Sequence, residues 1–149
     1  MNFEKKANLK LMGKNLEDLK VISAYLQDSI VIIRDVVFLK ENQTFIMIVN
    51  RFMWEDVEKG VFRHNKRIRC ALRFEEVMKV KSKNINQKKK KKLLEFLAIE
   101  TKSINDKAYE IRIFFAGDGV ITVISEVISM AMLDIGKPWN VKHIPRHKI

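Results

Sequence analysis

The chain has 149 residues, of which 47% are hydrophobic, and its 29 Lys and Arg against 18 Asp and Glu give a net charge of +11. This size and composition fit one globular domain with a sizeable core, and they exclude a disordered chain. No apolar run reaches the roughly 18 residues of a membrane span, the polar start 1–6 lacks the apolar core of a secretory signal, and the single Cys70 excludes an internal disulfide, so we expect a cytoplasmic protein.

The N-terminal part predicts an extended segment at 8–12 followed by a helix over about 16–27. Asn15 is a suitable N-cap, because its side chain can accept a hydrogen bond from a free N–H group of the first helical turn. Glu17 and Asp18 then lie at the positive end of the helix dipole. Apolar residues recur at helical spacing through the segment, which favours one amphipathic helix.

Strands are predicted next. The segments 30–33 and 36–39 are apolar and rich in β-branched residues, and 44–52 completes a hairpin after the four-residue loop 40–43. The segment 44–52 is apolar at both its odd and its even positions, which predicts a central strand covered on both faces. The stretch 53–65 is predicted to be a loop.

The clearest alternation covers 67–83, where most even positions are apolar and most odd positions are basic, with an interruption at Glu75 and Glu76. This period of two predicts one bent strand, or two strands of the same parity, with an apolar inner face and a basic outer face. Cys70 falls on the apolar face, where a thiol behaves as a small hydrophobic group.

The excess positive charge is local. Residues 79–92 contain eight lysines and no acid, which leaves 21 of the 29 basic residues against all 18 acidic ones in the rest of the chain. We interpret the lysine-rich stretch 82–92 as a loop. Two explanations stay open, namely compositional bias and a surface for a polyanionic partner.

Further strands are predicted at 93–100, 109–116 and 120–124, and the last two are joined by a hairpin turn at 117–119. The segment 93–100 could instead continue a helix that begins in the lysine run, but we favour a strand. The glycines of this turn are not followed by the Lys and Ser or Thr of a phosphate-binding P-loop.

A second helix is predicted over 125–135. Ser125 can cap it, apolar residues recur at helical spacing, and Gly136 and Pro138 can end it. Met130 and Leu133 lie off the apolar stripe of this helix and could face a partner subunit. The tail from residue 139 is basic and is expected to lie along the surface.

The predicted order is helix, about seven mostly antiparallel strands, helix. This order indicates an α+β fold in a single domain over 1–149. It is similar to the order of elements in the pleckstrin-homology-like (PH-like) barrel, so we expect a curved sheet or a PH-like barrel with an N-terminal and a C-terminal helix. The similarity concerns element order and implies no function.

Several clusters of residues together resemble a known family. The most specific cluster is Asn50-Arg51-Phe52 followed by Trp54-Glu55. The others are Glu17-Asp18-Leu19, Ser23, Leu26-Gln27-Asp28, Phe115-Ala116-Gly117 with Gly119, Leu133-Asp134 with Gly136, Trp139, and Pro145 with His147. They resemble an uncharacterised family of small alphaproteobacterial proteins, a domain of unknown function (family number 2948). The resemblance covers nearly the whole chain and implies a bacterial cytosolic protein, without an activity or a ligand.

The segment 50–55 is the first candidate site. Asn50, Arg51 and Glu55 place polar and charged groups beside two aromatic residues, so Arg51 could form paired hydrogen bonds with a carboxylate or phosphate while Trp54 stacks on the ligand. The structural alternative is a buried Arg51–Glu55 or Arg51–Asp28 pair that fixes the loop over the core.

Asp28 belongs to the same candidate site. It follows the first predicted helix, where a negative charge is unfavourable with the helix dipole and needs a positive partner such as Arg51 or Arg34. We predict a contact between Asp28 and Arg51.

A basic surface is the second candidate site, because a flat basic sheet face can follow a phosphate backbone. Its members would be Arg67, Arg69, Arg73, Lys79, Lys81, Lys88, Lys89, Lys90, Lys91 and Lys92. No aromatic residue interleaves with them for base stacking, and the alternative is a solvated strand face.

No metal site or cofactor is predicted. His143 and His147 are four residues apart, but Pro145 between them disfavours the helix that would bring both onto one metal ion. His64 stands alone in a polar stretch.

Three functions remain open from the sequence. The leading hypothesis is a non-enzymatic binding or scaffold domain that presents the loop around Arg51 and Trp54 to a protein partner or a small anionic ligand. The second is a nucleic-acid-associated protein that uses the lysine run. The third is an enzyme of a type that the sequence does not identify.

Overall fold

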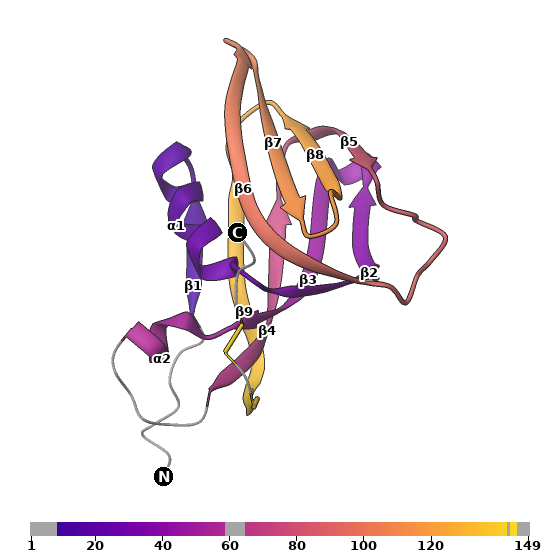
Figure 1. Ribbon diagram of the computed structural model, residues 1–149. Helices are drawn as coiled ribbons and strands as arrows, with labels where there is room; N and C mark the ends of the chain where they lie inside the picture. Colours follow the sequence, from indigo (N-terminus) through magenta and orange to yellow (C-terminus); the bar gives the residue numbers. More distant parts are fainter. Residues whose placement is uncertain (1–8, 59–64, 143, 146–149) are drawn as a thin grey trace.

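The computed structural model describes residues 9–58, 65–142 and 144–145. Its strands form one antiparallel sheet of nine strands in the order β1-β9-β4-β3-β2-β6-β7-β8-β5 (Figure 1). The strands are β1 (Lys10–Gly13), β2 (Ile30–Leu39), β3 (Thr44–Phe52), β4 (Lys66–Phe74), β5 (Val77–Lys83), β6 (Leu93–Asn105), β7 (Ala108–Phe115), β8 (Val120–Ser125) and β9 (Met130–Asn140). Two short helices, α1 (Leu16–Leu26) and α2 (Trp54–Glu58), and one 3-10 turn, η1 (Lys40–Asn42), complete the elements of this part of the chain. None of these helices has the length and apolar character to cross a membrane.

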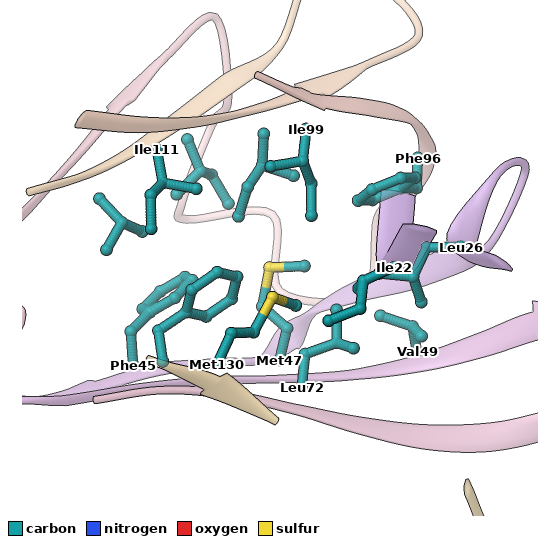
Figure 2. Close-up of a cluster of buried hydrophobic side chains, with 14 of the residues drawn as sticks. Ile22, Leu26, Phe45, Met47, Val49, Leu72, Phe96, Ile99, Ile111 and Met130 are labelled. Carbon is teal, nitrogen blue, oxygen red and sulfur yellow. The ribbon is translucent and has the colours of Figure 1, made fainter. Parts of the chain in front are cut away.

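The sheet is curved so that it covers the core from two sides. Strand β6 makes the transition, because Leu93–Glu95 pair with β2 and the residues from Phe96 onward pair with β7. Figure 2 shows Ile99 and Ile111 of one side facing the cluster of Phe45, Met47 and Leu72 on the other. Helix α1 adds Leu19, Ile22 and Leu26 to this core.

The N-terminal helix and the alternation at 67–74 are found as predicted. Asn15 caps α1, and its side-chain oxygen accepts a hydrogen bond of 2.8 Å from the backbone N–H of Asp18. In β4 the even residues from Ile68 to Phe74 are buried. Strand β3 is nearly covered along its whole length and lies inside the sheet, between β4 and β2.

The predicted C-terminal helix is wrong. After a turn at 126–129 the chain forms β9, which pairs with β4 on one edge and with β1 on the other. The stretch also has a period of two, since Met130, Met132 and Asp134 alternate with less buried residues and are all buried. Hydrogen bonding along two strand edges overrides the helical spacing. Met130 is therefore a core residue, whereas Leu133 is 37% exposed.

The predicted fold class needs correction for this reason. The described part of the chain has nine strands where about seven were expected, and the segment that was to close a PH-like barrel as a helix is itself a strand. The segments 30–33 and 36–39 are one strand, and α2 lies within the predicted loop 53–65. The segment 139–140 is the end of β9 and not the start of a tail.

The alternation predicted over 67–83 does not continue with the same inward positions beyond Glu75 and Glu76. Glu76 has a positive φ of 56°, and β5 then pairs with β8 with an irregularity between Val77 and Lys79. Val77 is fully buried and Met78 is 40% exposed, the reverse of the expected alternation. Strands β4 and β5 therefore follow each other in the chain but lie in different parts of the sheet, and they do not form one continuous basic face.

Candidate functional site: the Arg51 network and the pocket beside the lysine loop

Arg51 is the centre of a buried ion-pair network. The inward alternation of β3 that buries Met47 and Val49 also buries Arg51, whose side chain is 0% exposed. Its guanidinium donates to Asp134 through Nε–Oδ1 at 2.7 Å and Nη2–Oδ2 at 2.6 Å. It also donates to Glu55 through Nη1–Oε1 at 2.9 Å and Nη2–Oε2 at 2.7 Å. Two carboxylates therefore hold one guanidinium in paired, charge-assisted hydrogen bonds.

The electrostatics of the network fix Arg51 in its charged form. Burial by itself lowers the pKa of Arg51, but the hydrogen bonds and charges of Asp134 and Glu55 raise that pKa above its ordinary value. A fifth, longer contact of 3.5 Å joins Nη1 to the carbonyl oxygen of Phe52. A guanidinium has five N–H groups, and these contacts use them all. An anionic ligand would have to displace Asp134 or Glu55 in order to bind Arg51.

The network also fastens α2 to the end of α1. The Trp54 indole N–H donates to the backbone carbonyl of Gln27 at 2.8 Å, and the ring packs on Phe52 with centroids 4.6 Å apart. The Tyr25 ring lies 5.7 Å from the Arg51 guanidinium carbon, at cation–π distance. The aromatic residues of the candidate site therefore hold the local structure together.

Arg67 holds the neighbouring backbone. It donates to the carbonyl oxygens of Asp28 at 3.1 Å and Asn50 at 3.0 Å, and its guanidinium lies 5.8 Å from the Phe52 ring centroid. Burial lowers the pKa of Arg67, and the nearby charge of Asp28 acts in the opposite direction. Asp28 is buried and has a positive φ of 62°.

The structure thus brings the predicted residues of this site together in the arrangement of the structural alternative. Arg51 pairs with Glu55, as that alternative proposed. Its second carboxylate is Asp134, so the Arg51 N–H groups that we expected to bind Asp28 donate to Asp134 and Glu55 instead. Asp134 was not predicted as a partner because its segment was assigned to a helix. The available signal was the alternation of Met130, Met132 and Asp134, which places a single acid in an apolar series.

The predicted basic surface is divided. Arg67 is half-buried in the contacts above, while Arg69 and Arg73 lie near Asp35 at 3.9 Å and Glu75 at 3.2 Å. The lysines of the basic run 79–92 are exposed and lie on β5 and the following loop: Lys79, Lys81, Lys83, Lys88, Lys89, Lys90, Lys91 and Lys92. His64, His143 and His147 lie outside the described residues. Within those residues, no group of three His, Cys, Asp or Glu side chains could hold a metal ion.

A pocket of about 300 Å³ lies between β2, β5, β6 and the lysine-bearing loop 84–92, which we call the lysine loop. Its apolar lining comes from Ile33, Val36, Phe38, Phe45, Val80, Ile85, Leu94 and Ile121, and its polar lining from Lys81, Ser82, Gln87 and Lys90. None of these lining residues is acidic.

The lysine loop is anchored on both sides of this pocket. The Gln87 side-chain N–H donates to Ser82 Oγ at 2.8 Å, and the Asn84 side chain donates to the backbone carbonyl of Asp118 at 3.0 Å. At its other end, the backbone N–H groups of Ile33 and Arg34 donate to carbonyl oxygens of the loop at 3.0 and 2.9 Å. Figure 1 shows the loop running around the side of the molecule where β2 and β5 lie. The loop is therefore a folded wall of the pocket that carries exposed lysines.

Comparison with curated proteins and with solved structures gives no match. A family model described as "Protein of unknown function (DUF2948)" matches residues 9–147. This range includes the Arg51 network and the pocket, and it confirms the resemblance drawn from the sequence clusters. The chain belongs to the DUF2948 family.

Proposed function

We propose that this protein is a non-enzymatic binding domain whose ligand occupies the pocket between β2, β5 and the lysine loop. The observation that carries the proposal is a cavity of about 300 Å³ lined by eight apolar and four polar residues. This combination is typical of small-molecule sites, although the volume is at the lower end of their range. The Arg51 network has a scaffold role in this proposal, because its hydrogen-bonding groups are used within the protein.

The proposal places the protein in the cytoplasm. Cys70 is a buried free thiol, and burial, together with the nearby charge of Asp134, raises its pKa to about 12. A thiol in that state is protonated and unreactive at neutral pH. A cysteine that is kept as a free thiol fits the reducing conditions of the cytoplasm.

Nucleic-acid association is the second candidate, and one observation favours it. The exposed lysines of β5 and the lysine loop are adjacent in the chain and face solvent, although Arg69 and Arg73 lie on a different part of the sheet. Binding through these lysines would weaken steeply with salt, because it depends on counterion release. The third hypothesis, an enzyme of unidentified type, stays a prediction.

Binding of the neutral dye Nile red, whose fluorescence rises in apolar surroundings, tests the pocket. We expect saturable binding to the folded wild type, and loss of most of it in Val80→Phe, because the added ring fills space between β5 and Phe45. Val127→Phe is the matched control, since Val127 is 46% exposed in the turn before β9 and does not line the pocket.

Equal dye binding by both variants would place the dye elsewhere and contradict the proposal, as would no binding by a wild type with a native circular dichroism spectrum. Val36→Phe fills the same pocket from β2 and serves if Val80→Phe does not fold.

A further inference from the structure

The pocket opens along a seam where two strand edges are not paired with each other. In β2 the register shifts between Val31 and Val36, and beyond this point Val36–Leu39 pair with β3 alone. Strand β5 pairs with β8 on one edge and is the last strand of the sheet. Both strands line the pocket, so the pocket lies between two strands whose edges are not paired with each other.

The inner and outer walls of this pocket differ in chemistry. The inner wall is formed by core residues, among them Phe45 and Leu94, which are 1% and 6% exposed. The outer wall is formed by β5 and the lysine loop, which contribute Lys81, Lys90 and the Gln87–Ser82 hydrogen bond. With two lysines and no acid, the outer wall is positively charged.

Resting on the proposed function, we infer that the ligand is a single-chain amphiphile with an anionic head, of which a fatty acid is the simplest example. Its hydrocarbon chain lies between β2 and β5, and its head is held at the rim by Lys90 and Lys81. The apolar part of the lining favours a flexible chain, since each buried methylene group contributes hydrophobic free energy and needs no hydrogen-bond partner. The lysines require no particular geometry of the anionic head, because an ammonium group acts as a point charge with rotatable donors.

The anchored loop supports this ligand over a larger polyanion. Its hydrogen bonds to β5, to the β7–β8 turn and to β2 fix the backbone of Lys90 beside the cavity. The head group of a bound amphiphile therefore meets a preformed positive rim, which limits the conformational entropy lost on binding.

Displacement of Nile red from the full chain tests the inference. We expect decanoate to displace the dye about fivefold more tightly than decanol, which is the effect of two exposed ion pairs. Affinity should rise about fourfold with each methylene from hexanoate upward, and then level off when the chain fills the pocket.

Two substitutions in the same loop separate local recognition from general charge. Lys90→Gln should weaken decanoate about twofold and leave decanol unchanged. Lys91→Gln removes the same charge from the next residue, which does not line the pocket, and should leave both affinities unchanged.

Equal binding of decanoate and decanol, or equal effects of Lys90→Gln and Lys91→Gln, would overturn the anionic head and leave the proposed apolar pocket standing. Binding to phosphatidylglycerol vesicles without binding of free decanoate would overturn it in favour of a membrane surface. Failure of Nile red, decanoate and decanol alike would instead refute the proposed function.

Discussion

The buried ion pairs of Arg51 allow one substitution to be predicted in detail. In Asp134→Asn the side chain keeps its shape, but it loses its charge and places an N–H donor where the guanidinium also donates. Asp134 is 2% exposed, so water cannot replace the lost acceptor. Breaking a buried pair by removing one partner costs roughly 3 to 5 kcal/mol. Because Glu55 still faces Arg51, we expect the lower end of that range, about 3 kcal/mol of unfolding free energy.

Glu55→Gln supplies the internal comparison. Glu55 also forms two hydrogen bonds with Arg51, but its side chain is 19% exposed and water reaches it. We therefore expect a smaller loss of about 1 kcal/mol. Lys20→Gln is the surface control, because the Lys20–Glu17 pair is exposed on α1 and should contribute nothing measurable.

The assay is urea unfolding followed by circular dichroism, with thermal melting in parallel. If the midpoint falls while the slope of unfolding free energy against urea concentration stays the same, the native state itself is destabilised. For a chain of this size, the loss in Asp134→Asn corresponds to a melting temperature lower by about 10 °C. A loss in Asp134→Asn no larger than that in Lys20→Gln would refute the claim that this network holds β3 and β9 together.

Three further outcomes follow from particular contacts. Gly13→Ala should destabilise the protein by about 1 to 3 kcal/mol in urea unfolding, because the new Cβ would lie 2.7 Å from Leu19 Cδ2 where α1 packs on β1; an unchanged midpoint would mean that the helix can move away. Asn15→Ala should cost about 1 kcal/mol through loss of the cap to Asp18, measured in the same way. Burial raises the pKa of Cys70 from 9.0 to about 12, so above pH 9 the unfolded thiol ionises while the native one stays protonated, and stability should fall as the pH rises. Cys70→Ala should remove this part of the pH dependence, and identical slopes in both proteins would contradict it.

The parts of the fold that the sequence predicted correctly are those specified by local patterns. Helix α1 has its cap and its apolar spacing within one short segment, β4 has an unbroken alternation from Ile68 to Phe74, and β3 is a short run that is apolar at both odd and even positions. The segment 125–135 satisfies both a helical spacing and an alternation, so its local pattern is ambiguous. The decision depends on β4 and β1, which both pair with β9 and lie far from it in the chain.

The same non-local dependence limited the prediction of the site. Arg51 and Glu55 are four residues apart, and their pairing was foreseen as the structural alternative. Arg51 and Asp134 are 83 residues apart, and no local pattern joins them. The pocket was beyond prediction, because its lining depends on where β2 leaves β6 and on a loop whose charge alone suggested a solvated run.

Strand β3 connects the two sites at its opposite ends. Phe45, near its start, lines the pocket, and Arg51, near its end, is held by Asp134 and Glu55. A seam with unpaired edges forfeits hydrogen bonds and packing contacts, so the stability of the sheet has to come from elsewhere. The charge-assisted hydrogen bonds at the Arg51 end supply part of it without entering the pocket. Stability and binding should therefore respond to different substitutions: Glu55→Gln should lower the unfolding free energy and leave Nile red binding by the folded protein unchanged, whereas Val80→Phe should remove most of the dye binding in a protein that still folds.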